Sequence, residues 1–145
     1  MGISQEELGR FEAAMRRLRL RSVRIMGRAI SRFDLTVSQY TLLFSLFHPE
    51  RCKMSELARE LGITMGAATS IVDRLIKAGL VKRERSTEDR RLVLVSLSKK
   101  GRRMVEEVHK VTLGLMTRLL SRLSAKEREA FLSAYEKMSR EIESL

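Results

Sequence analysis

One cysteine and the lack of any long apolar run distinguish this sequence of 145 residues. A lone cysteine, Cys52, excludes an intrachain disulfide and is typical of cytosolic proteins. The longest apolar run, from Leu42 to Phe47 with one serine inside it, is far too short to cross a lipid bilayer. Glu6 and Glu7 interrupt the N-terminal region, so no secretory signal is predicted. We therefore expect a cytoplasmic protein without a membrane partner.

Sequence signatures of an enzyme are also missing. Only His48 and His109 can act as bases near neutral pH, and no nucleophile motif lies close to either. The Gly62-x-x-x-Gly66 spacing lacks the lysine and hydroxyl residue of a phosphate-binding loop. His48-x-x-x-Cys52 offers two metal ligands where a structural zinc site needs four, which favours a plain turn. We expect no catalysis, no cofactor and no metal.

What the chain has in excess is positive charge, with 29 Lys and Arg against 18 Asp and Glu, a net charge of +11. Residues 74–103 contain eleven basic and three acidic residues, and residues 1–33 contain eight arginines and three glutamates. The net charge of residues 34–73 is −2, and that of residues 104–145 is zero. A solvated surface explains many charge runs, but this concentration favours a polyanionic partner.

Apolar spacing predicts a mainly α fold with a small β-wing. Helices are expected over residues 5–33, 37–47, 54–61, 64–78, 98–123 and from 124 onward, and strands over 80–85 and 92–97. The sequences Thr36-x-x-Gln39 and Ser124-x-x-Glu127 are capping boxes that start two of these helices. Gly62 follows one helix and Gly79 follows the next, as glycines that end helices do.

The third and fourth predicted helices form a helix-turn-helix. The turn from Leu61 to Thr64 is short enough to cross them steeply, and Ile63 is expected to point into the core. The two strands that follow form a cationic ribbon. A helix in this setting fits the major groove of duplex DNA, while the ribbon reaches phosphates or a neighbouring minor groove. An ordinary helical hairpin is the alternative, which the ribbon makes less favourable.

Three stretches resemble the MarR family of winged-helix transcriptional regulators. They are Gly62-Ile63 to Gly79-Leu80-Val81, the loop Glu88-Asp89-Arg90-Arg91, and Val95-x-Leu97-Ser98-x-x-Gly101. The resemblance covers nearly the whole chain. It implies one domain over residues 1–145, with a winged helix-turn-helix lobe at 35–101 flanked by long dimerisation helices at 1–34 and 102–145. It also implies a homodimer that binds an inverted-repeat operator in double-stranded DNA.

The same resemblance implies roles for single residues. The recognition helix would run from Thr64 to Ala78, and Arg91 would enter the minor groove. Asp89 would orient the wing by pairing with an arginine. An equally good explanation is that Asp89 only favours the turn of the loop. Arg90 would bind phosphates or join that ion-pair network. The expected DNA contacts are Thr64, Met65, Gly66, Ala67, Thr69, Ser70, Arg74, Arg90 and Arg91.

The start of this recognition helix departs from the usual family pattern. Met65, Gly66, Ala67 and Ala68 stand where longer hydrogen-bonding side chains are common. Small apolar side chains can contact thymine methyl groups but cannot form bidentate pairs with guanine or adenine. Direct readout is therefore expected from Thr69, Ser70 and Arg74, with phosphate contacts and DNA shape supplying much of the rest.

Apolar stripes at both ends of the chain predict dimerisation. They are Leu8, Phe11, Met15 and Leu18 near the N-terminus, and Phe131, Tyr135, Met138 and Ile142 near the C-terminus. Packing within one chain is the alternative, but a small winged lobe leaves these stripes little surface to cover.

The resemblance further implies that a small aromatic or amphipathic effector releases a repressor from DNA. An effector pocket is expected at Phe11, Met15, Phe33, Phe44 and Phe47, although core packing is the simpler explanation for each. Cys52 is a candidate redox switch, because the basic side chains of Arg51 and Lys53 would favour a thiolate, but a passive, half-buried thiol is the simpler explanation.

Two other classes of protein stay open. A sequence-independent architectural DNA-binding protein explains the charge and the plain recognition helix. A protein-interaction adaptor that uses a winged helix without nucleic acid is the other, and the arginines of the wing argue against it.

Overall fold

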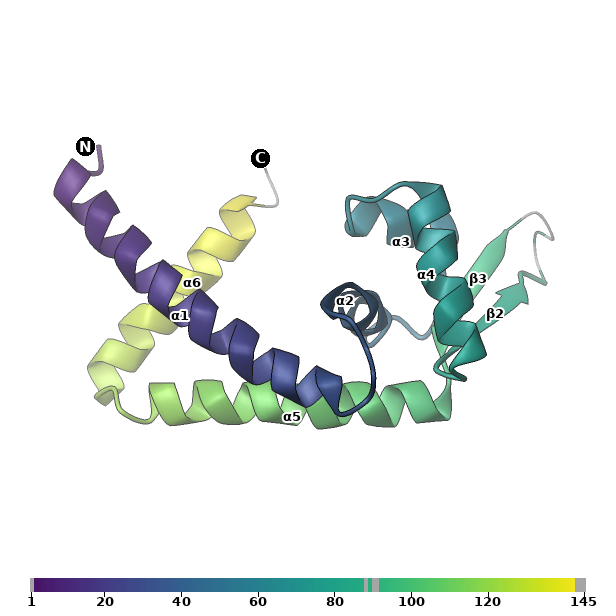
Figure 1. Cartoon of the computed structure of the whole chain (residues 1–145). Coiled ribbons are helices and arrows are strands. Elements are labelled where there is room, and N and C mark those ends of the chain that lie inside the picture. The colour runs from purple at the N-terminus through teal and green to yellow at the C-terminus, as the bar shows by residue number, and fades with distance from the viewer. Residues whose placement is uncertain (1, 88, 90–91, 143–145) are drawn as a thin grey trace. The chain divides into compact units, whose positions relative to one another are not determined.

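A computed structural model of the chain describes residues 2–87, 89 and 92–142. The elements, in chain order, are α1 (Gln5–Ser31), α2 (Val37–Ser45), β1 (Cys52–Lys53), α3 (Met54–Glu60), α4 (Met65–Lys77), β2 (Val81–Arg85), β3 (Val93–Leu97), α5 (Lys99–Leu120) and α6 (Ala125–Ile142) (Figure 1). The chain divides into two compact units, Met1–Val111 and Thr112–Leu145, which are described separately. The predicted mainly α fold with a small β-wing is confirmed.

Capping side chains set where several helices begin. The Gln39 amide donates to Thr36 Oγ1 at 3.2 Å, and the Thr36 amide donates to Gln39 Oε1 at 2.8 Å. Ser124 and Glu127 form the same reciprocal pair at the start of α6. Both predicted capping boxes are therefore confirmed. Each satisfies two amide groups that would otherwise lack a partner at the helix end.

The main core of the first unit lies between α2, α3, α4, the sheet and the start of α5. Its fully buried side chains include Leu42, Leu43, Leu46, Leu57, Val72, Leu75, Val95 and Val105. A second cluster of Ala29, Ile30, Tyr40 and Val108 joins the end of α1 to α2 and α5. Each buried leucine contributes about 1.5–3 kcal/mol of transfer free energy. The inner side of α4 is thereby held against the core.

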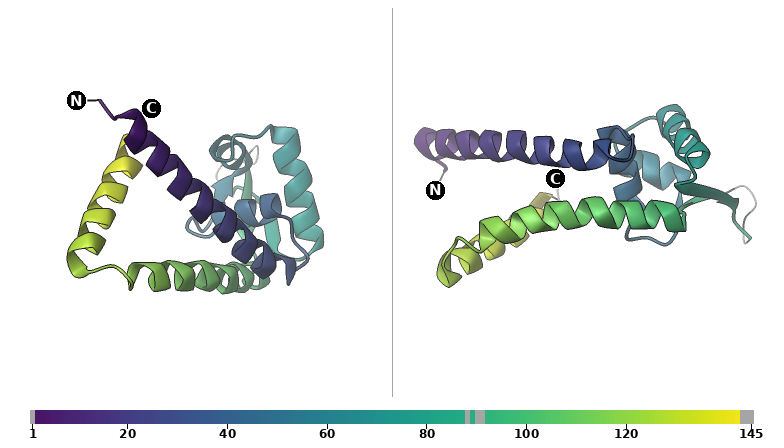
Figure 2. Two further views of the ribbon diagram at one scale, coloured as in Figure 1. Left: turned by 60° about the vertical axis from the view of Figure 1, so that its left-hand side comes forward. Right: turned by 60° about the horizontal axis from the view of Figure 1, so that its bottom comes forward.

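The strands form one antiparallel sheet in the order β1-β3-β2. Val81 of β2 is opposite Leu97 of β3, and Arg85 is opposite Val93, as expected for a hairpin. β1 is an addition to the two predicted strands and pairs Cys52 with Val95. Figures 1 and 2 show that the hairpin of β2 and β3 projects beyond α4.

The apolar residues of α1 lie in two different environments. Ala29 and Ile30, near the end of the helix, are buried, whereas Leu8, Phe11 and Met15 are exposed. Only the last part of this helix therefore contributes to the core of the first unit.

The second unit contains the end of α5 and all of α6. The chain turns after Leu120, three residues before the predicted helix end, and Arg128 donates from Nη1 to the Leu120 carbonyl at 3.4 Å. No side chain of α6 is buried among the described residues. Phe131 and Tyr135 stack with their ring centroids 5.9 Å apart, so the predicted apolar stripe lies on the surface of the chain.

Candidate nucleic-acid interface

α4 presents a continuous exposed surface opposite its buried residues. Ala68, Val72 and Leu75 are buried, and this leaves the other side of the helix outside the core. The exposed or half-buried residues of that side are Met65, Gly66, Ala67, Thr69, Ser70, Asp73, Arg74 and Lys77. All of the α4 residues that the sequence predicted to contact DNA lie on this surface. The major groove of DNA is wide enough to admit an α-helix such as α4.

The start of α4 is fixed by its cap and by the preceding turn. Thr64 Oγ1 accepts from the Ala67 amide at 3.2 Å and so caps the start of the helix. Gly62 has a φ of +63°, a conformation that favours glycine. The Ile63 amide then donates to the Ala58 carbonyl at 3.0 Å, and the Ile63 side chain packs against the main core. These contacts set the crossing of α3 and α4.

The junction of α4, β2 and α5 explains the Leu97-Ser98-x-x-Gly101 stretch. Ser98 Oγ donates to the Gly79 carbonyl at 2.7 Å and accepts from the Gly101 amide at 2.9 Å, so one hydroxyl joins two helix ends. Lys100 Nζ donates to the Ala78 carbonyl at 3.0 Å, which places a cation at the end of α4. A Cβ atom at position 101 would clash with the Leu80 carbonyl, so only glycine fits there.

An ion pair connects α4 to the hairpin. Arg83 Nη1 lies 3.0 Å from Asp73 Oδ1, and both side chains are partly exposed. In β2, Arg83 follows Val81 by two residues and so shares the side of the strand that faces the core and α4. Neither Asp73 nor Arg83 was predicted from the sequence to be part of the site.

A surface pocket of about 340 Å³ lies between the start of α3, α4 and the hairpin. Thr69 and Met65 line it from α4, and Arg83 lines it from β2. Lys53, Met54, Ser55, Leu92 and Val93 complete the lining. A depression of the surface thus lies between the outer parts of α4 and of the hairpin, beside the packed core that joins these two elements.

The tip of the wing is described only in part. Arg90 and Arg91, the predicted phosphate and minor-groove residues, lie outside the described residues. The Asp89 amide donates to Ser86 Oγ at 3.3 Å, and the Leu92 amide donates to the Asp89 carbonyl at 2.9 Å. These bonds give Asp89 a backbone role in closing the loop, and its predicted pairing with an arginine stays a prediction.

The residues of the predicted effector pocket lie in different surroundings. Phe44 and Phe47 stack with centroids 6.3 Å apart, and both rings contact His109. Arg102 lies over the Phe47 ring at 5.5 Å and donates to the Phe47 carbonyl. Phe33 lines a separate cavity of about 170 Å³ beside Val108. Phe11 and Met15 are exposed on the first half of α1.

Cys52 lies on β1 rather than in the predicted plain turn. Burial, together with the nearby carboxylates of Glu56 and Glu60, raises the pKa of the Cys52 thiol to about 11. The expectation that Arg51 and Lys53 favour a thiolate is therefore wrong, because the local field opposes the negative charge. A protonated thiol at neutral pH is a poor redox sensor.

Among the described residues, no group of three or more His, Cys, Asp or Glu side chains can hold a metal ion. No described helix is both long enough and apolar enough to span a membrane.

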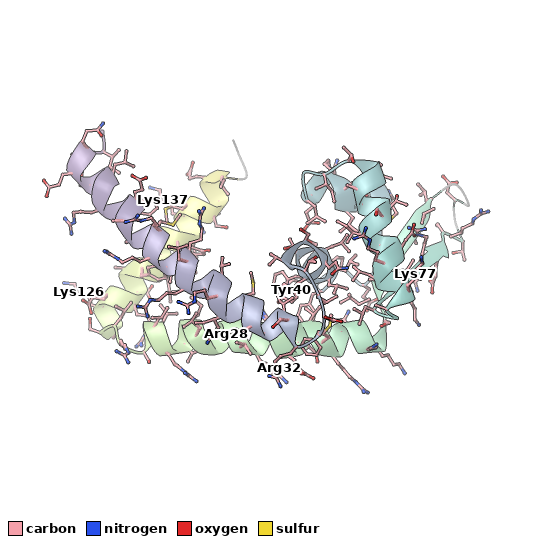
Figure 3. The ribbon with its side chains drawn as sticks, viewed as in Figure 1. Arg28, Arg32, Tyr40, Lys77, Lys126 and Lys137 are labelled. Atoms are coloured by element: carbon pink, nitrogen blue, oxygen red, sulfur yellow. The ribbon has the colours of Figure 1, made fainter. Side chains whose placement is uncertain are left out.

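The sequence analysis missed Lys77 as well as the Asp73–Arg83 pair. Lys77 is exposed on the last turn of α4 and is labelled in Figure 3. Its spacing from Ser70 and Arg74, seven and three residues, places it on the same side of the helix, and this periodicity was visible in the sequence.

Comparison with known proteins identifies the family. Residues 35–93 match the model of the MarR family. The uncharacterized HTH-type transcriptional regulator YfiV of Bacillus subtilis (strain 168) is 30% identical over 112 residues, which cover 77% of this chain and 70% of that relative.

Solved structures agree with this match. A MarR family protein from Bacillus stearothermophilus has a TM-score of 0.86 at 22% identity, covering 97% of this chain and 99% of the other. A mutant MarR from E. coli complexed with operator DNA has a TM-score of 0.67 at 25% identity, covering 94% and 99%. The chain therefore belongs to the MarR family of DNA-binding transcriptional regulators.

Proposed function

We propose that this protein is a homodimeric repressor that binds an inverted-repeat operator. In this proposal α4 enters the major groove, and the hairpin of β2 and β3 reaches the neighbouring minor groove. The observation that carries the proposal is the exposed side of α4, with Ser70, Arg74 and Lys77 in one row next to a projecting hairpin. The related MarR bound to operator DNA supports the same use of the fold.

Dimerisation is supported by apolar side chains that the chain leaves uncovered. On α1, Phe11 and Met15 are about half exposed, and on α6 Tyr135 and Met138 are more than half exposed. Exposed apolar stripes of this extent on long helices are typical of protein–protein interfaces. Residues 1–34 and 102–145 are accordingly proposed as the dimerisation segments, and 35–101 as the DNA-binding lobe.

Sequence readout by α4 is proposed to depend on few hydrogen bonds. Thr69, Ser70 and Arg74 supply polar groups, whereas Met65 and Ala67 supply only apolar contacts. Thymine methyl groups are suitable partners for such side chains in the major groove. The operator half-sites are therefore expected to be rich in thymine where the start of α4 lies, with additional selectivity from minor-groove shape.

Release by a small aromatic or amphipathic effector and a cytoplasmic location complete the proposal. A redox-sensing function at Cys52 is not proposed, because the raised pKa of its thiol disfavours it. The remaining alternative function is that of an architectural DNA-binding protein. Such a protein has a similar positive charge but no preference for one DNA sequence over another.

Selection of bound sequences from a random duplex pool tests the proposal. A palindromic winner with half-sites about 34 Å apart is expected for a dimer with two recognition helices. A protein that enriches no sequence, and binds random and selected duplexes equally at matched salt, is an architectural binder. Enrichment of a single unpaired half-site contradicts the dimer.

An arginine substitution tests the wing on the selected duplex. Arg91→Ala is expected to weaken binding by about 1–3 kcal/mol, the range for a good specific contact. Arg10→Ala, on the exposed side of α1, removes the same charge far along the chain from the lobe and serves as the control. Equal affinities of the two variants at fixed salt, measured by fluorescence anisotropy, exclude Arg91 from the interface.

A further inference from the structure

The ion pair between Asp73 and Arg83 joins the proposed recognition helix directly to the wing. Asp73 lies in the second half of α4, and Arg83 is the middle residue of β2. Their charged atoms are 3.0 Å apart, with 49% of the Asp73 side chain and 33% of the Arg83 side chain exposed. Surface ion pairs with this exposure contribute little to folding stability, so we expect the fold to form without this pair.

The pair adds a surface contact to those that already join α4 to the hairpin. In the core, Val81 and Val95 of the hairpin are buried in one cluster with Val72 and Leu75 of α4. At the base of the hairpin, the Leu80 amide donates to the Leu75 carbonyl and the Ser98 amide donates to the Leu80 carbonyl, both at 2.9 Å. Between α4 and β2 lies Gly79, whose φ of +73° marks a sharp change of chain direction. Beyond the buried Val81 and Val95, the ion pair at Arg83 is the contact from which we expect a restraint on the outer part of the hairpin relative to α4.

The register of the sheet extends this effect to the rest of the wing. Arg83 is opposite Val95 of β3, and Val95 is also paired with Cys52 of β1. An ion pair made by the middle of β2 therefore positions the whole hairpin, including the strand that leads to its tip.

The carboxylate of Asp73 lies where a negative charge opposes DNA binding. Asp73 follows Thr69 and Ser70 on the exposed surface of α4, which the proposed function places in the major groove, between two rows of DNA phosphates. A carboxylate near phosphates is repelled by them, and its pairing also takes up a guanidinium that phosphates would attract. Electrostatics alone thus predicts that removing Asp73 strengthens DNA binding.

We infer that Asp73 and Arg83 are positioning residues that hold the hairpin at a fixed angle to α4, so that both elements meet DNA together. This inference rests on the proposed function. When two contact elements are rigidly linked, binding of the second follows binding of the first at high effective concentration. A pivoting hairpin lowers the fraction of molecules that are ready to bind, and the apparent affinity falls with it.

A pair of matched variants separates the two effects by the sign of the change. Asp73→Asn and Glu84→Gln each remove one negative charge from the lobe, and Glu84 is an exposed residue of the same hairpin. Glu84→Gln is expected to bind the selected duplex as tightly as wild type or more tightly. Asp73→Asn is expected to bind about three- to tenfold more weakly despite its added positive charge. Asp73→Asn that binds as tightly as Glu84→Gln overturns the inference.

A double-mutant cycle with Asp73→Asn and Arg83→Gln separates the effect of the contact between the two residues from the effect of the Arg83 charge on DNA binding. Loss of the Arg83 charge weakens DNA binding whether or not Asp73 is present. Loss of the contact between the two residues weakens binding only in the first substitution, because the second then has no contact left to remove. Arg83→Gln is therefore expected to cost less in the Asp73→Asn protein than in wild type. Additive effects of the two substitutions, with unchanged melting temperature and dimer size, contradict a positioning pair.

Hydrogen exchange in the free protein tests the geometry without DNA. The amides of the β2–β3 ladder are expected to exchange faster in Asp73→Asn than in wild type or Glu84→Gln, because strands that the ion pair no longer holds against α4 separate from each other more often. Equal exchange in all three proteins overturns the inference. This measurement also distinguishes it from failure of the proposed function, which is instead seen when wild type does not prefer the selected duplex over a shuffled one.

Discussion

In the winged lobe, Leu42, Leu57 and Leu75 are fully buried within the chain, whereas on α6 Phe131 and Tyr135 are 49% and 61% exposed. Both regions show apolar residues at spacings of three and four. Such a spacing defines one side of a helix but does not say which molecule covers that side. The lobe is therefore stabilised by contacts within its own chain, while the exposed stripe of α6 is the surface that the proposed dimer would cover.

The largest effect is expected from a cavity in the lobe. Leu75→Ala removes a fully buried side chain of α4 and should lower the free energy of unfolding by about 2–5 kcal/mol. Urea denaturation at one protein concentration measures this loss, and sedimentation under native conditions should show an unchanged dimer. If the Leu75→Ala protein dissociates into monomers while its lobe stays folded, Leu75 supports the dimer and not the core of the lobe, which contradicts this prediction.

A substitution on α6 should act on assembly instead. Phe131→Ala is expected to weaken dimerisation by about 2 kcal/mol or more, because large aromatic side chains dominate interface energies. Sedimentation equilibrium over a dilution series measures the change. Lys137→Ala on the same helix, a residue labelled in Figure 3, is the control and should leave dimerisation unchanged. A stable monomer of wild type at all concentrations contradicts the dimer itself.

Two serine caps allow a finer comparison of the regions. Ser98 caps α5 and also donates to the Gly79 carbonyl, whereas Ser124 bonds only within its own capping box. Ser98→Ala is expected to destabilise the protein by about 2 kcal/mol and Ser124→Ala by about 1 kcal/mol. Thermal unfolding of both variants at equal concentration checks the order. Equal losses would mean that the bond to Gly79 contributes nothing.

Helix boundaries could be predicted because the signals that set them are local. Thr36 with Gln39, and Ser124 with Glu127, bond to each other within four residues of sequence, so the pattern alone reveals them. The exposed side of α4 could also be predicted, since Ala68, Val72 and Leu75 mark its opposite side at helical spacing. Resemblance to a family then supplied the expected roles, which periodicity cannot provide.

Features that depend on distant contacts could not be predicted in the same way. β1 has only two residues, too few for any alternation to be visible, and it exists because Cys52 pairs with Val95. The pair of Asp73 and Arg83 requires the hairpin to fold back toward α4. The pKa of Cys52 was predicted in the wrong direction, because its neighbours in sequence are basic while burial and two glutamates of α3 govern it.

The smallest effect concerns the capping box of α6 and its dependence on pH. Hydrogen bonds from the side chain and backbone of Ser124 lower the pKa of the Glu127 carboxyl below its ordinary value. A carboxyl with a lowered pKa in the folded state stabilises that state fully above its unfolded pKa and loses the contribution as pH falls through the folded value. Acid should therefore weaken the start of α6 in wild type.

Glu127→Gln removes this titration, so it should lower the melting temperature slightly near neutrality, where wild type has the full contribution, and should make the melting temperature depend less on pH in the acid range. Glu129→Gln, on the same helix without a bond to Ser124, is the matched control and should keep the steeper acid dependence of wild type. Because Glu127 is fully exposed, the difference is expected to be small compared with that from Phe131→Ala. If both variants follow wild type through the acid range, the box does not act through the ionised carboxylate, and the start of α6 depends on the Ser124 hydroxyl alone.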